Sequence, residues 1–153
     1  MNKNEIGRVL AIALRSEKEG PMREVETVEA VANGGLVGDL TSEPDRGITF
    51  LSARQWSEVT GELEVELPWH TRRANVLIEA GGLGNLIGKT VTLGEVEVAV
   101  KGPSKPCGLM ERLHPGLKAA LMPDTRGGIY GRILRGGRID VGDVLRLKRE
   151  RVE

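Results

Sequence analysis

The apolar residues of this chain recur mostly with a period of two, and glycine interrupts them at short intervals. In GEVEVAVKG, Val96, Val98 and Val100 alternate with polar or small residues, and segments 63–67 (LEVEL) and 142–149 (GDVLRLKR) behave similarly. Half-buried β-strands give this pattern, and closely spaced glycines mark the turns between them. The sequence therefore predicts a mainly β protein, an antiparallel barrel or sandwich, with few helices.

Two short helices interrupt this pattern. Ser52 is a good N-cap for a helix that begins at Ala53 and ends at Gly61, and segment 115–122 (PGLKAALM) begins with proline and stops before another one. Parallel α/β folds need more helix than these two segments supply. The N-terminal segment lacks a long apolar region and a cleavage site, so we expect it to form the first strand.

Composition narrows the classes of partner and compartment. The 153 residues have the size of one domain, predicted to span 1–153. Positive and negative side chains balance at 22 each and aromatic residues make up 3%, which gives no sign of a nucleic-acid or membrane partner. No segment is apolar for long enough to span a membrane. One cysteine forms no internal disulfide, in agreement with a cytoplasmic protein.

Two well-known motifs are absent. In GGLGNLIGKT, Leu83 occupies the position where a phosphate-binding P-loop requires glycine, so the segment is predicted to be a glycine-rich connection between strands. His70, His114 and Cys107 do not have the spacing of a zinc site.

The single cysteine is the strongest candidate for chemistry. Cys107 lies in PSKPCG, outside any apolar repeat, between Pro106, which restrains the backbone, and Gly108, which allows close approach. Lys105 favours the thiolate, the reactive form of the side chain. A buried cysteine that only fills the core remains the alternative interpretation.

A second candidate is the segment HTRRANVLI. If it begins a strand, Arg73 lies on the face of Asn75 and Arg72 on the opposite face. A guanidinium beside an amide suits a phosphate or carboxylate. An exposed basic pair on a barrel rim is the alternative interpretation.

Several segments together resemble the MOSC domain, named after the C-terminal domain of molybdenum cofactor sulfurase. The resemblance runs from about Arg8 to Leu147. The segments that carry it are PMREVETVEAVANGGLVGD, DRGITFLSARQW, RRANVLI (as Arg-x-x-Asn or Arg-x-Asn), KPCGLM and RGGIYGRILRGGRIDVGDVLRL.

The resemblance implies a compact, mainly β barrel, antiparallel or mixed, that binds a molybdenum cofactor (molybdopterin) or its precursor. It implies that Cys107 carries sulfur as a persulfide or ligates molybdenum, so Cys107 is both the catalytic and the metal-binding candidate. The predicted cofactor-binding residues are Arg73, Asn75, Lys105 and Arg46. The predicted partners are a pterin-type small molecule and a separate cysteine desulfurase or reductase. No pyridoxal phosphate is expected in this chain alone.

Two other functions remain open at this stage. One is a non-catalytic module that binds an anionic metabolite or a partner protein. The other, which the resemblance also implies, is a molybdenum-dependent reductase of N-hydroxylated compounds.

Overall fold

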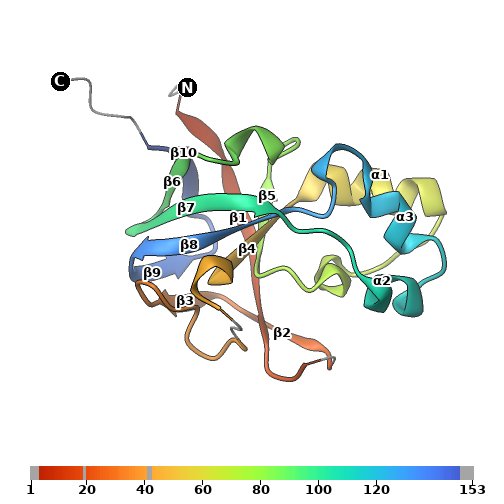
Figure 1. Cartoon of the computed structure of the whole chain (residues 1–153), viewed down its shortest axis with the longest axis horizontal. Helices are drawn as coiled ribbons and strands as arrows, with labels where there is room; N and C mark the ends of the chain where they lie inside the picture. The colour runs from red at the N-terminus through yellow and green to blue at the C-terminus, as the bar shows by residue number, and fades with distance from the viewer. Residues whose placement is uncertain (1–3, 19, 41–42, 149–153) are drawn as a thin grey trace.

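The computed structural model describes residues 4–18, 20–40 and 43–148, and a closed β-barrel dominates them (Figure 1). The barrel strands are β1 (Glu5–Arg15), β4 (Ile48–Ser52), β5 (Val76–Glu79), β6 (Thr90–Leu93), β7 (Val96–Pro103), β8 (Ile129–Arg135) and β10 (Val144–Leu147). Within the described residues these seven strands follow the order β10-β6-β7-β8-β4-β5-β1, and β1 pairs with β10 to close the barrel. β4 and β5 run parallel, whereas the other barrel neighbours are antiparallel. The predicted mainly β barrel is confirmed.

The long strand β1 connects the barrel to a hairpin beneath it. Its first residues pair with β10, its middle with β5, and its last four, Ile12 to Arg15, with β2 (Met22–Val25). The chain then enters β3 (Thr27–Ala30), which pairs with β9 (Gly137–Asp140) in a separate two-stranded sheet. The β1–β2 hairpin therefore extends past the barrel rim, where it can contribute to a site.

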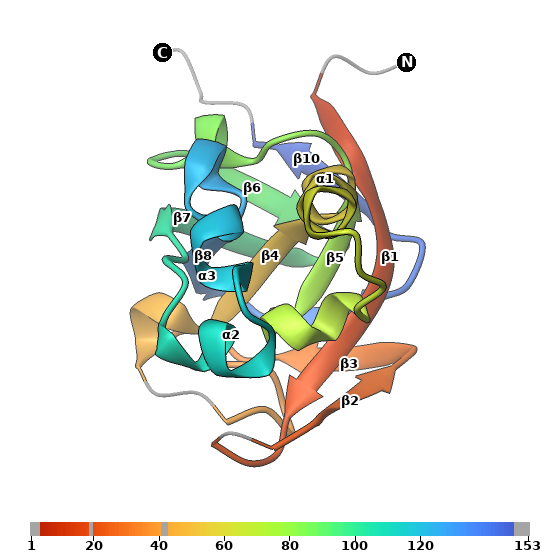
Figure 2. The same cartoon turned by 90° about the vertical axis from the view of Figure 1, so that its right-hand side faces the viewer.

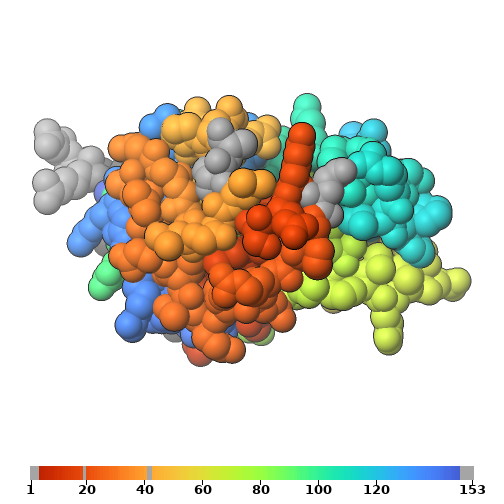
Figure 3. Space-filling view, turned by 90° about the horizontal axis from the view of Figure 1, so that it is seen from below, coloured from red at the N-terminus to blue at the C-terminus, as the bar shows by residue number. Residues whose placement is uncertain are grey.

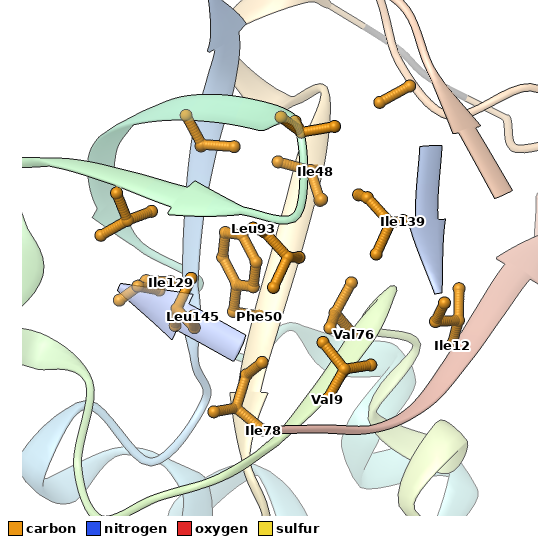
Figure 4. Close-up of a cluster of buried hydrophobic side chains, with 14 of the residues drawn as sticks. Val9, Ile12, Ile48, Phe50, Val76, Ile78, Leu93, Ile129, Ile139 and Leu145 are labelled. Carbon is orange, nitrogen blue, oxygen red and sulfur yellow. The ribbon is translucent and has the colours of Figure 1, made fainter. Parts of the chain in front are cut away.

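The period-two apolar residues fill the barrel. Figure 4 shows side chains from facing strands meeting around Phe50 in the interior. Phe50, Ile48, Val76 and Leu145 have no exposed surface, and each such side chain contributes about 1.5–3 kcal/mol by leaving water. The core thus holds the strand ends, and the loops between them, in fixed positions.

Three α-helices cover one end of the barrel (Figure 2). The helices are α1 (Ala53–Leu63), α2 (Gly108–Leu113) and α3 (Leu117–Leu121), with 3₁₀ turns η1 (Pro44–Arg46), η2 (Trp69–Arg72), η3 (Gly84–Leu86) and η4 (Pro123–Thr125). The Ser52 hydroxyl accepts a hydrogen bond from the Gln55 amide at 3.1 Å, as its predicted capping role requires. A second apolar cluster, which includes Trp56, Met110 and Leu121, joins the helices. None of the helices in the described residues is long and apolar enough to cross a membrane.

Two local predictions are wrong. Segment 63–67 does not form a strand: Leu63 completes the last turn of α1, and Glu64 ends the helix in the left-handed region with φ 52°. Leu63 follows Val59 by four residues, so both lie on the helix face that packs against the second cluster. The strand expected to begin near Arg73 begins only at Val76, after the turn η2.

Candidate functional site

A pocket of about 250 Å³ lies where the β1–β2 hairpin, the turns η1 and η2 and the β7–α2 loop meet. We call it the basic pocket. Its lining residues are Lys18, Arg46, Thr49, Arg72, Arg73, Ala74, Ser104, Lys105, Cys107, Leu109, Met110 and Gly127. Five of these side chains are cationic and, among the described residues, none of the lining is a carboxylate. The pocket is therefore built to attract an anion.

Cys107 stands at the edge of the basic pocket, immediately before α2. Its side chain is exposed, whereas the preceding Pro106 is buried. Its backbone is extended, and its carbonyl accepts a hydrogen bond from the Met110 amide at 3.0 Å. Buried proline on one side and the first helical turn on the other fix the backbone, so the thiol is both accessible and held in place.

Arg72 forms hydrogen bonds with two segments of the chain that line the pocket. Its Nε donates to the Gly127 carbonyl at 3.0 Å, and its Nη2 donates to the Ser104 carbonyl at 2.8 Å. Burial lowers the pKa of Arg72 to about 10, while the nearby negative charge of the Cys107 thiolate opposes that shift. The expectation that Arg72 faces away from the site is wrong, because the chain is not extended at this point.

Arg73, unlike Arg72, donates its hydrogen bonds to the turn between β1 and β2. Its backbone lies in the left-handed region with φ 65°, where it ends the turn η2. Its guanidinium donates to the carbonyls of Gly20, Glu17 (2.8 Å) and Lys18 (3.1 Å). Figure 3 shows the N-terminal segment in red and orange lying beside the yellow-green segment that follows α1. Arg73 thus lines the pocket and holds the β1–β2 hairpin against it.

Asn75 is completely buried and is not among the pocket-lining residues. Its Oδ1 accepts hydrogen bonds from the amide and hydroxyl of Thr49, at 3.1 and 3.0 Å, and its Nδ2 donates to the Ala13 carbonyl at 3.2 Å. The structure therefore separates Asn75 from Arg73: the amide joins β1, β4 and the start of β5, and it reaches the pocket only through Thr49.

The other two predicted residues, Arg46 and Lys105, both line the pocket. The Arg46 guanidinium lies 4.1 Å from the centre of the Tyr130 ring, and its Nε is 3.2 Å from a Glu43 carboxylate oxygen. Lys105 is exposed two residues before Cys107. Cys107, Arg73, Arg46 and Lys105 are thus brought together, and Asn75 lies behind them.

Sequence reasoning missed three parts of the pocket: Lys18, Arg72 and Gly127. Arg72 could have been found, because the Arg-x-x-Asn register of the motif selects it rather than Arg73. Lys18 and Gly127 carried no local signal, since only the closed barrel brings the β1–β2 hairpin and the loop before β8 to the same place.

A protein-built metal centre is not present in the described residues, where no group of three or more His, Cys, Asp or Glu side chains could hold an ion. Among the described residues that line the basic pocket, Cys107 is the one side chain of these types.

Comparisons with known proteins agree with this architecture. A family model of the MOSC domain matches residues 37–146. The fold is similar to the YUAD protein from Bacillus subtilis, with a TM-score of 0.78 and 17% identity over 96% of this chain and 98% of that one. It is also similar to YiiM from Geobacillus stearothermophilus (TM-score 0.71, 15% identity, 95% and 75% coverage). YiiM from Escherichia coli gives a TM-score of 0.69, with 17% identity and 95% and 72% coverage. No curated protein matched the sequence.

Proposed function

Because the chain belongs to the MOSC domain family, whose model covers residues 37–146, we propose that its basic pocket binds one end of a pterin-type molybdenum cofactor or precursor. One observation carries the proposal. The only cysteine of the chain shares a pocket with five cationic side chains, and no carboxylate is present among the described lining residues.

The residues of the pocket fit such a group. Guanidinium and ammonium groups bind phosphate strongly, and the pocket offers both, from Arg72, which donates to the Ser104 carbonyl at 2.8 Å, and from Lys105. A volume of about 250 Å³ is below the roughly 300–1,000 Å³ of pockets that enclose a whole drug-sized ligand. The pocket therefore takes one anionic end and leaves the remainder outside.

Cys107 provides the soft sulfur ligand or the sulfur-carrying group. Thiolates suit soft metal centres and attack sulfur readily, so the same exposed side chain serves either role. When bound, the cofactor would supply a redox-active metal. The proposal places the protein in the cytoplasm, with a separate desulfurase or reductase as its partner.

Metal and sulfur analysis of protein from a molybdenum-replete host tests the proposal. Wild type and Cys107→Ser are compared, with Lys89→Ala as the control because Lys89 is exposed and lines none of this pocket. We expect stoichiometric molybdenum and pterin, or a persulfide on Cys107, in wild type and Lys89→Ala. Cys107→Ser should lose both.

The stability of Cys107→Ser makes this result interpretable. Serine is a preferred N-cap residue, and position 107 is the N-cap of α2 without a side-chain capping bond. We therefore expect stability within about 0.5 kcal/mol of wild type or slightly above it. Absence of molybdenum, pterin and persulfide from wild type would contradict the proposal and favour a non-catalytic module for an anionic metabolite. Reduction of an N-hydroxylated compound by the loaded protein would extend it to a reductase.

A further inference from the structure

The basic pocket keeps hydrogen-bond donors that no described residue uses. Nε and Nη2 of Arg72 donate hydrogen bonds to backbone carbonyls of the pocket lining. None of the described residues accepts a hydrogen bond from its Nη1. Nη1 is also not a buried unsatisfied atom, since in the described residues that class contains only the Nε of Arg126. Because Arg72 lines the pocket, Nη1 is open to a pocket ligand. The Lys105 ammonium has no ion-pair partner in the described part of the chain.

The number of cysteines restricts how sulfur can reach Cys107. If the proposed sulfur-carrying role holds, a persulfide must form on a chain with one thiol. Sulfide adds to a thiol only if an oxidant removes two electrons, and no second cysteine is available for that exchange. A donor that already contains sulfane sulfur avoids this requirement. The sulfur atom that it transfers is already at the oxidation level of the outer sulfur of a persulfide, so no oxidant is needed.

We propose that the basic pocket takes a small thiosulfonate-class anion, with thiosulfate as the simplest member, and that Cys107 removes its terminal sulfur. This inference rests on the sulfur-carrying branch of the proposed function. The Cys107 thiolate attacks the terminal sulfur of thiosulfate, a sulfur–sulfur bond forms, and the donor's own sulfur–sulfur bond breaks. Sulfite leaves with the electron pair of that bond. Thiolate and thiosulfate become persulfide anion and sulfite, so charge and electrons balance without a proton or a co-reactant.

The lining explains why an anionic donor is favoured over a neutral one. A thiolate and a dianion repel each other, and the cations that line the pocket with Cys107 lower that barrier. Negative charge then grows on the leaving sulfite, where Nη1 of Arg72 and the Lys105 ammonium can stabilise it. A protein persulfide donor would need the exposed thiol but not a cationic pocket beside it.

The experiment incubates the full chain with thiosulfate and measures sulfite released and the gain of one sulfur atom on Cys107 by mass spectrometry. A neutral dialkyl trisulfide serves as the second donor. Lys105→Gln is the test variant because Lys105 is exposed, and Lys89→Gln is the control. Lys105→Gln should lower the thiosulfate rate about tenfold relative to the trisulfide rate, the effect of one charge-assisted hydrogen bond, because any change in the thiolate content of Cys107 affects both donors alike. Lys89→Gln should change neither rate, and Cys107→Ser should abolish both.

Two results would overturn the inference in distinguishable ways. Persulfide from the trisulfide or from a desulfurase, but not from thiosulfate, leaves sulfur carriage intact and rejects the anionic donor. Persulfide from none of these donors rejects sulfur carriage as well, whereas the molybdenum content of the same protein decides cofactor binding independently. Equal thiosulfate rates in wild type and Lys105→Gln would also reject the assigned role of the pocket cations.

Discussion

Replacing Asn75 distinguishes a ligand-binding amide from a structural one. The structure predicts that Asn75→Ala destabilises the protein rather than only weakening ligand binding. The substitution removes the acceptor for the Thr49 amide and the donor to the Ala13 carbonyl. Both hydrogen bonds involve the side chain of Asn75, which is fully buried. Each buried group left unsatisfied costs about 1–3 kcal/mol, so the total is roughly 2–6 kcal/mol.

Such a loss is large compared with the ~5–15 kcal/mol stability of a typical domain. Urea denaturation measures it directly. With a slope of about 1–3 kcal/mol per molar urea, the midpoint should fall by roughly 1 M or more. The slope itself should not change, because the same surface becomes exposed on unfolding.

Asn75→Asp is the matched control. It keeps an oxygen for Thr49 but faces the Ala13 carbonyl with a second oxygen in place of the amide nitrogen. Burial raises the pKa of a carboxyl at such a position, and the protonated form can donate to that carbonyl. The variant should therefore recover stability relative to wild type as the pH falls toward about 4, the unfolded value for aspartate. An unchanged urea midpoint for Asn75→Ala, together with lost anion binding, would refute this reasoning and place the amide in the pocket.

Three further outcomes follow from the pocket walls. Arg72→Ala should weaken sulfate binding in calorimetry at least as much as Arg73→Ala, since Arg72 has the open Nη1; an effect confined to Arg73→Ala would contradict the placement of Arg72. Gly127→Ala should lower the urea midpoint and Cys107 loading together, because a Cβ there would lie 2.3 Å from the Ser104 carbonyl oxygen; unchanged loading would show that the wall can move freely. Arg126 holds the pKa of Glu62 below its ordinary value of 4.5, so this pair stabilises the fold above that pH and the contribution is lost as the pH falls below it. Glu62→Gln should remove that part of the acid dependence of stability, and an identical acid profile would argue against the pair.

The barrel could be predicted because its cause is distributed along the chain. Val96, Val98 and Val100 each repeat the same choice of an apolar residue at every second position, and all three are buried in β7. Because the alternation recurs in many segments, a wrong assignment of one residue does not change the predicted fold class. The strand predicted over segment 63–67 was wrong because five residues are too few to distinguish the period of a strand from that of a helix. The helix α1 that precedes the segment extends into it as far as Leu63.

The site was less predictable because it depends on backbone geometry at a few residues. Alternation assigned Arg72 and Arg73 to opposite faces, and that rule holds only for extended chain. The turn η2 and the left-handed φ of Arg73 instead bring both side chains to one pocket. Asn75 was predicted to lie beside Arg73 on one face of a strand. In the structure its side chain is buried behind the pocket that Arg73 lines. Cys107 was identified correctly as a residue outside the core because proline and glycine on either side of it are local signals.

The balanced composition of the chain also conceals its electrostatics. A formal charge of zero gives no sign of a large anionic partner, yet five cations line one pocket. They come from four separate segments, and Arg72 and Arg73 are the only two that are adjacent in the sequence. Within the described structure, carboxylates outside the pocket lining pair with other cations, Glu58 and Glu62 with Arg126 and Asp39 with Arg15, and among the pocket cations Arg46 pairs with Glu43. Recognition of a small anion requires only this local excess, because the field that acts on a bound ion is set within about one Debye length, roughly 8–10 Å.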